Sequence, residues 1–200
     1  TTARQTKGNR MIILASQSPR RKEILKEILG DIPFETIPSH FDERSIQNSS
    51  LRKLCLMEAI GKAKDVSKEH PDDIVIASDT MVLFEHKQLG KPKDENEAFN
   101  MLRMLQDNTH EVITAYALFQ GDKELKSRVV SAKLHIEKMA DLEIQEYIET
   151  GSPMDKAGAY GIQDKDFITS TLLEGDESTV MGLPLYELVA DLYELHILKH

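Results

Sequence analysis

Met11-Ile-Ile-Leu-Ala-Ser-Gln-Ser-Pro-Arg-Arg-Lys22 joins the signals of a strand, a turn and the start of a helix. Its first residues form a short continuous apolar run, which is typical of a buried strand. Pro19 then suits the first position of a helix, and the hydroxyl of Ser18 can cap the free N–H groups there. We therefore expect a helix over residues 18–29 that ends at Gly30.

Two arginines follow Pro19 directly. The free N–H groups at a helix N-terminus attract anions. The guanidinium forks of Arg20 and Arg21 match phosphate oxygens in pairs. A polyphosphate ligand is the favoured interpretation, and the alternative is a surface helix start with two solvated arginines.

The composition limits the class of protein. The chain has 200 residues, of which 40% are hydrophobic and 30% charged, as in a soluble globular protein with one domain or one domain of two lobes. Its formal net charge of −9 argues against binding to a nucleic-acid polymer, but not against a small anionic ligand. No run approaches the ~18 apolar residues that span a bilayer, so we expect no membrane association.

The single cysteine, Cys55, excludes an internal disulfide and fits a reducing, cytoplasmic location. It falls on the apolar face of a helix expected over residues 47–68, which favours a packed thiol over a nucleophile. Residues 1–10 are polar and basic and lack the apolar core of a secretory signal. They are expected to be a disordered leader or a cloning remnant, ahead of a single domain over residues 11–200.

Strands and helices alternate along the chain, which predicts an α/β fold with a mixed sheet covered mainly by helices. An antiparallel pair around the turn 120–123 is expected to extend the sheet into a second lobe. Within this pair, apolar and polar residues alternate over residues 130–137, which indicates one buried and one wet face. Further strands are expected at 34–37, 73–84 and 167–173, and further helices at 94–106, 141–150 and 184–198.

Asp79 lies inside the apolar run of residues 73–84. A charge in a central strand is costly to desolvate unless something pairs with it, so a metal ion or a catalytic role is the favoured explanation. Asp42 and Glu43 are adjacent loop carboxylates of the kind that Mg²⁺ prefers. Solvated surface carboxylates are the alternative for these two.

Lysines and glycines supply further candidates. Lys62 lies late in the helix expected over residues 47–68, where a solvent-exposed lysine would also suit the negative end of the helix. Lys91 is held stiffly between Gly and Pro, although it could equally be an ordinary turn lysine. The loop of residues 152–163 carries Lys156 and is rich in glycine, which allows close backbone approach to a ligand but is also common in loops.

From Met11 to about Leu195 the chain resembles the Maf family of nucleotide pyrophosphatases. Five motifs occur in the family's order and make the resemblance specific. They are Leu-Ala-Ser-Gln-Ser-Pro-Arg-Arg at 14–21, Ser-Asp-Thr at 78–80, Gly-Lys-Pro at 90–92, Met-Asp-Lys-Ala-Gly-Ala-Tyr-Gly-Ile-Gln at 154–163 and Val-Met-Gly-Leu-Pro at 180–184. The resemblance implies an elongated mixed α/β sheet flanked by helices, with two lobes around a cleft, similar to inosine triphosphate pyrophosphatase.

The resemblance also implies an activity. The family hydrolyses nucleoside triphosphates between the α and β phosphates with a divalent metal, here Mg²⁺ or Mn²⁺. By motif, Asp79 is the implied proton acceptor, and Glu43 with Asp79 would hold the metal. The implied specificity residues, which resemble those of the dTTP and UTP branch rather than the 7-methyl-GTP branch, are Arg20, Thr80 and Gln163. The implied phosphate-binding residues are Ser16, Arg21, Lys62, Lys91 and Lys156.

Two positions depart from the family pattern. Ser78 stands where alanine is frequent, and Asp164 stands where glycine is frequent. We expect Ser78 to leave the mechanism intact. Asp164 either places a negative charge near the expected phosphate cleft or faces outward.

Other functions stay open at this point. One is a non-catalytic, nucleotide-binding regulator of cell division or septum formation, which would bind nucleotide and release no product. Another is a phosphatase acting on a sugar phosphate, which would release orthophosphate. Modified pyrimidine nucleotides as substrates and a homodimer as the assembly are likewise open.

Overall fold

The computed structural model describes residues 10–200, so the prediction for residues 1–10 falls, except for Arg10, outside the described part. The chain divides into two compact units, in agreement with the two lobes expected from the sequence. The first unit comprises the chain as far as Asp79, together with Ala115–Val129 and Gly182–His200. The second unit comprises Thr80–Thr114 and Val130–Met181.

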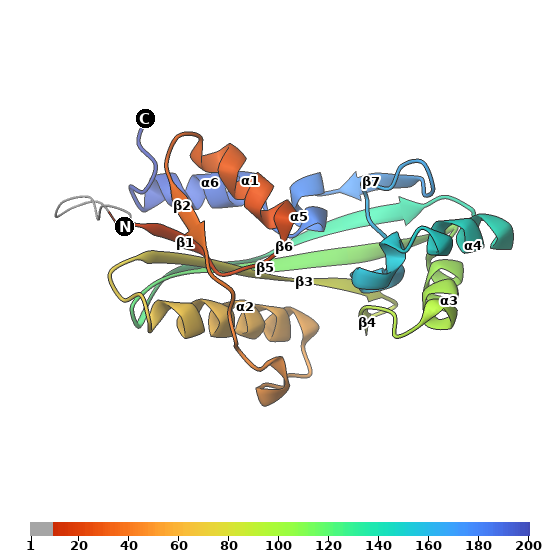
Figure 1. The fold of residues 1–200 in the computed structure, drawn as a ribbon, viewed down its shortest axis with the longest axis horizontal. Helices are drawn as coiled ribbons and strands as arrows, with labels where there is room; N and C mark the ends of the chain where they lie inside the picture. Colours follow the sequence, from red (N-terminus) through yellow and green to blue (C-terminus); the bar gives the residue numbers. More distant parts are fainter. Residues whose placement is uncertain (1–9) are drawn as a thin grey trace. The chain divides into compact units, whose positions relative to one another are not determined.

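A mixed seven-stranded sheet confirms the predicted α/β class (Figure 1). The strand order is β2-β1-β3-β5-β6-β7, and β4 pairs with β3. Strand β1 runs parallel to both β2 and β3, whereas the pairs β3–β4 and β6–β7 are antiparallel. The strands are β1 Ile12–Leu14, β2 Phe34–Thr36, β3 Ile74–Phe84, β4 Lys87–Leu89, β5 Asn108–Gln120, β6 Lys123–Ile136 and β7 Ser170–Glu174.

Three α-helices belong to the first unit: α1 Pro19–Leu29, α2 Leu51–Ser67 and α6 Leu185–Glu194. Figure 1 shows α1 and α6 on one face of the sheet and α2 on the other. The Ser18 hydroxyl accepts a hydrogen bond from the N–H of Arg21 at 3.3 Å, which confirms the predicted N-cap. Helix α2 starts later than predicted because Ser50 caps it, accepting from the N–H of Lys53.

A buried ion pair fastens α6 to the strands of the first unit. Asp191 is fully buried and accepts two hydrogen bonds from the guanidinium of Arg128, at 2.8 and 2.6 Å. The hydroxyl of Tyr116 donates to the same carboxylate. Burial alone would raise the pKa of Asp191, but these hydrogen bonds lower it, so the carboxylate stays ionised.

The second unit contains α3 Glu95–Leu105, α4 Asp141–Glu149 and α5 Glu177–Met181. Helices α3 and α4 contact each other and two short 3₁₀ helices, η2 Ser152–Asp155 and η3 Ala157–Ala159. Another 3₁₀ helix, η1 Glu43–Ser45, lies in the first unit. The largest side chains of the core shared by α3 and α4 are Leu102, Leu105, Ile144, Tyr147 and Tyr160.

Three details differ from the sequence prediction. Residue Phe167 is not in a strand, because its N–H bonds to the carbonyl of Asp164 and continues a turn; β7 starts at Ser170. The last helix ends at Glu194 rather than near residue 198, because His196 adopts a positive φ of 57°. Helix α5 was not predicted. Among residues 10–200, no helix combines the length and apolar character needed to cross a membrane.

His110 is a buried histidine in the second unit. Its Nε2 lies 2.6 Å from the hydroxyl of Tyr160, and its buried Nδ1 has no hydrogen-bond partner. Burial lowers the pKa of His110 to about 4, so the imidazole is neutral in the folded protein at neutral pH.

This pKa predicts an acid-dependent loss of stability. An unfolded histidine has a pKa of about 6.5, so below that pH the unfolded chain binds a proton that the folded chain refuses. Between about pH 7 and pH 5 the free energy of unfolding should therefore lose about 2 kcal/mol through this residue. Urea titrations of wild type and His110→Gln at both pH values measure the effect.

The variant should lose less stability than the wild type over that interval. His40→Gln, at an exposed histidine, is the control and should keep the wild-type pH dependence. Equal pH dependence in His110→Gln and wild type would contradict the assignment.

Candidate active site

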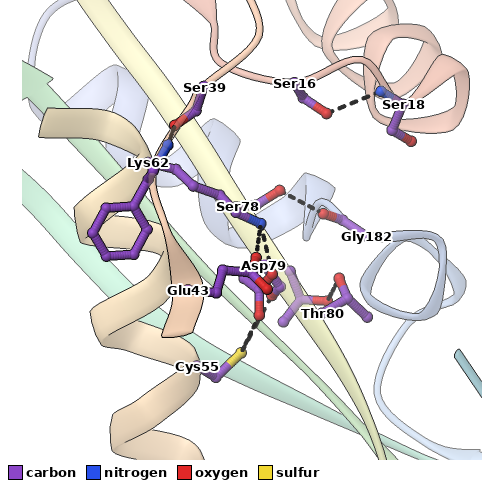
Figure 2. A network of polar contacts seen from close by, with 12 residues as sticks. Ser16, Ser18, Ser39, Glu43, Cys55, Lys62, Ser78, Asp79, Thr80 and Gly182 are labelled. Atoms are coloured by element: carbon purple, nitrogen blue, oxygen red, sulfur yellow. Dashed lines mark hydrogen bonds and ion pairs between the residues drawn. The ribbon is translucent and has the colours of Figure 1, made fainter. Parts of the chain in front are cut away.

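The candidate site is built around Asp79, the last residue of β3 within the first unit. Its carboxylate is buried, and its Oδ1 accepts a hydrogen bond from Lys62 Nζ at 2.7 Å. Lys62 projects from α2 and also pairs with Glu43 of η1, whose Oε1 lies 3.0 Å from Nζ. Figure 2 shows Lys62, Glu43 and Cys55 converging on Asp79. The sequence analysis had selected three of these residues, Asp79, Lys62 and Glu43, and the structure places them in contact.

Glu58 is a further member of this cluster that the sequence analysis missed. It projects from α2 one turn before Lys62, is 7% exposed and hydrogen-bonds to the side chain of Asp79. One oxygen from each of Glu43, Glu58 and Asp79 lies within 4.8 Å of the others. A signal did exist in the sequence, because Glu58 interrupts the apolar stripe formed by Cys55 and Ala59.

These three carboxylates fit a divalent metal. Oxygen-only donors suit Mg²⁺ and Mn²⁺ rather than softer metals. Glu43 is exposed whereas Glu58 and Asp79 are buried, so an ion held here would meet solvent on one side only.

The charges of the cluster are strongly coupled. Burial raises the pKa of Glu58, and its hydrogen bond to the Asp79 carboxylate raises it further, so the Glu58 carboxyl holds its proton. For Asp79, burial opposes ionisation, but the hydrogen bond with Glu58 and the charge of Lys62 outweigh it and lower the pKa. For Lys62, the charge and hydrogen bond of Asp79 likewise outweigh burial and raise the pKa. Asp79 is therefore an ionised acceptor and Lys62 a charged donor at neutral pH.

Cys55 packs beneath this cluster. Its Sγ donates to the main-chain carbonyl of Asp79 at 3.3 Å. Burial raises the pKa of the Cys55 thiol to about 12, and the charge of Asp79 adds to the effect. Because only the thiolate is strongly nucleophilic, the structure confirms the predicted packed thiol.

Arg21 is joined to this region through Gly182. Its Nε donates to the carbonyl of Gly182 at 2.8 Å, and the hydroxyl of Ser78 donates to the same carbonyl at 2.9 Å. Gly182 has a φ of 112°, and an added Cβ would lie 2.8 Å from Arg21 Nε, so only glycine fits. Burial lowers the pKa of Arg21, while the Asp79 carboxylate opposes that change. Ser78 therefore helps to fix the backbone that orients Arg21.

The start of α1 carries the other predicted residues of the first unit. The Oγ of Ser16 accepts from the N–H of Ser18 at 3.0 Å, which fixes the turn between β1 and α1. Arg20 is half-buried on the first turn of α1. The structure thus contains the strand, turn and helix start that the sequence predicted.

Thr80 follows Asp79 and belongs to the second unit. Its hydroxyl lies 2.8 Å from the hydroxyl of Thr114, whose own proton is donated to the carbonyl of Thr179 at 2.7 Å. Since Thr114 has only one hydroxyl proton, Thr80 must be the donor in the first of these bonds. Toward any further group Thr80 can therefore act only as an acceptor.

The remaining predicted residues lie on loops of the second unit. Lys91 is exposed, and the preceding carbonyl, that of Gly90, accepts a hydrogen bond from the N–H of Gly158 at 3.1 Å. The φ of Gly158 is 73°, and an added Cβ would lie 3.0 Å from Val82. Gln163 is exposed in the same loop as Lys156, whose ammonium bonds to the carbonyl of Ser152 at 2.7 Å.

Together these features define an α/β protein with three clustered carboxylates beside Lys62 and Arg21. A family model described as "Maf-like protein" matches residues 11–195. A relative from Clostridium botulinum (strain Okra / Type B1), named "dTTP/UTP pyrophosphatase", is 44% identical over 192 residues, covering 93% of this chain and 97% of its own. A relative of the same name from Geobacillus sp. (strain WCH70) is 40% identical over 186 residues, covering 93% and 98%.

The chain belongs to the Maf family. Among solved structures, a HAM1 protein from Coxiella burnetii is similar to 93% of this chain and 100% of its own, with 17% identity and a TM-score of 0.49.

Proposed function

We propose that this protein hydrolyses dTTP and UTP to the nucleoside monophosphate and pyrophosphate. The observation that carries the proposal is the ionised, buried Asp79, held by Lys62 within a cluster of three carboxylates. The names of the Clostridium and Geobacillus relatives support the same activity. The single, buried cysteine supports a cytoplasmic location.

Asp79 is the group proposed to accept a proton from water. Its pKa is below the ordinary value, so it is unprotonated and available at neutral pH. The 2.7 Å bond from Lys62 fixes the orientation of the carboxylate, as a general base requires. The water oxygen would bond to the α-phosphorus, the bond from that phosphorus to the bridging oxygen would break, and pyrophosphate would leave with the electron pair.

Glu43, Glu58 and Asp79 would hold a divalent cation, for which we propose Mg²⁺ or Mn²⁺. When bound, such a cation polarises phosphate oxygens and offsets their negative charge.

The cationic residues are proposed to bind phosphate oxygens. Arg21 is fixed through Gly182, so its guanidinium is pre-organised before any ligand binds. We propose the same task for Ser16, Lys62, Lys91 and Lys156, and a part in substrate choice for Arg20 and Gln163. Lys62 also pairs with Asp79 and Glu43, so its phosphate contact would be made by an ammonium that orients the base as well.

The hydroxyl of Thr80 is proposed to distinguish between pyrimidine bases. It can offer only an acceptor, because its proton goes to Thr114. Thymine and uracil present an N–H donor at ring position N3, whereas cytosine presents an acceptor there. An acceptor facing an acceptor leaves both unpaired, which a buried site rejects strongly.

Product analysis tests the activity itself. Incubation with dTTP and with Mg²⁺ or Mn²⁺ should release one pyrophosphate for each dTMP. Asp79→Asn removes the proton acceptor while keeping the shape, and should lower kcat by at least about a hundredfold, the usual size of a general-base contribution.

Asp73→Asn is a matched control at the start of the same strand region and should stay active. Release of orthophosphate would contradict the bond assignment and favour a phosphatase. Nucleotide binding without product would favour the regulatory function. Near-normal turnover by Asp79→Asn would remove Asp79 from the base role.

The role of Thr80 predicts a change in selectivity. Thr80→Val keeps the shape and loses the acceptor, so kcat/KM for dTTP should fall by about tenfold, the equivalent of one hydrogen bond. The much slower reaction with dCTP should change little, so the dTTP/dCTP ratio should shrink. If both substrates lose the same factor, Thr80 does not read the base.

A further inference from the structure

A hydrogen-bonded network within the second unit contains Asp164, Ser152, Tyr147, Gly161 and Lys156. Asp164 Oδ2 accepts from the hydroxyl of Tyr147 at 2.5 Å and from the hydroxyl of Ser152 at 2.6 Å. The Tyr147 hydroxyl accepts in turn from the N–H of Gly161 at 3.0 Å. Asp164, left open by the sequence between an outward-facing charge and one near the phosphates, has two hydroxyl partners within the second unit.

The protons of this network have a single direction. A hydroxyl has one proton, and a carboxylate can only accept. Since Ser152 gives its proton to Asp164, its oxygen is left as an acceptor for Lys156, whose Nζ lies 3.0 Å away. The chain of donation therefore runs from Lys156 to Ser152 to Asp164.

Three acceptors surround the ammonium of Lys156. They are the carbonyl of Ser152 at 2.7 Å, the hydroxyl of Ser152 at 3.0 Å and Asp155 Oδ1 at 3.0 Å. The Lys156 side chain is 18% exposed, whereas that of Asp155 is 80% exposed. An exposed ion pair is worth little, so Asp155 is the acceptor that a ligand oxygen can replace most easily.

We propose that Asp164 is a positioning residue for Lys156 and, through it, for the phosphate chain of the substrate. Asp164 orients the Ser152 hydroxyl, Ser152 holds two protons of the Lys156 ammonium, and the third proton passes from Asp155 to a phosphate oxygen. This inference rests on the proposed function, because it takes Lys156 to bind phosphate.

The stem of Lys156 and the carboxylate of Asp164 both lie against Gly161. A Cβ added to Gly161 would lie 3.0 Å from Lys156 Cε and 3.1 Å from Asp164 Oδ2. The absent side chain at this buried glycine thus leaves room for both groups. The packing supports a fixed position for the lysine rather than a freely moving one.

An opposite role for Asp164 makes a different prediction. If its charge merely repelled the triphosphate, removing that charge would strengthen binding and lower KM. If Asp164 positions Lys156, removing the charge frees the Ser152 proton to point elsewhere and weakens binding. The two roles therefore change KM in opposite directions.

The test compares Asp164→Asn, Ser152→Ala and the wild type for dTTP kinetics and for calorimetric binding of inorganic pyrophosphate. Both variants should raise KM and weaken pyrophosphate binding, each by about tenfold, the value of one charge-assisted hydrogen bond. The kcat of both should stay near wild type, because Asp79 is unaffected.

Two controls complete the experiment. Asp166→Asn removes the same charge from an exposed position two residues away and should leave KM unchanged. Tyr147→Phe removes the other donor to Asp164 but keeps Ser152 in place, so its pyrophosphate affinity should also stay near wild type. A lower KM or unchanged pyrophosphate binding in Asp164→Asn would overturn the proposal.

Failure of the proposed function would look different. In that case the wild type itself would release no pyrophosphate from dTTP. Pyrophosphate binding by the wild type and the two variants would still test the link between Asp164 and Lys156. Ser152→Ala keeps the test decisive should Asp164→Asn fail to fold.

Discussion

The ion pair between Lys62 and Asp79 is the interaction on which the site depends. Strand β3 is buried along most of its length, and an isolated carboxylate there would be costly to desolvate. The 2.7 Å contact with Lys62 keeps Asp79 ionised, and the bonded Glu58 carboxyl keeps its own proton instead. One charged lysine on α2 therefore determines which carboxyl can act as a base. Removing one partner of such a pair leaves an uncompensated charge, which typically costs more than the pair contributes.

Backbone geometry fixes the cations of the first unit as firmly as the fold fixes the carboxylates. The carbonyl of Gly182 accepts from both Ser78 and Arg21, so one residue with a positive φ links β3 to the first turn of α1. The second unit uses a different device, in which Asp164 acts on Lys156 through Ser152. In both units, groups remote from the proposed chemistry decide where a positive charge lies. Pre-organisation of this kind reduces the free-energy cost of ordering charged side chains on binding.

Features with local causes could be predicted from the sequence. The start of α1 depends on Ser18 and Pro19, which are adjacent, and the buried thiol of Cys55 follows from helical periodicity. The demand for a partner of Asp79 was also visible, because charge is disfavoured inside an apolar strand. The identity of that partner was not, since Lys62 lies 17 residues earlier and reaches Asp79 only through the packing of α2 on β3. The same holds for Asp191 and Arg128, which are 63 residues apart. Glu58 was missed because the helix was examined for apolar residues, although a carboxylate on its inward stripe was itself a signal.

The central claim is that water held by Asp79 attacks the α-phosphorus. Hydrolysis of UTP in water enriched in ¹⁸O, followed by mass spectrometry of both products, tests it most directly. Attack at the α-phosphorus places the heavy oxygen in UMP and leaves pyrophosphate unlabelled. Label found in pyrophosphate, with none in UMP, would mean attack at the β-phosphorus and would contradict this account of the site.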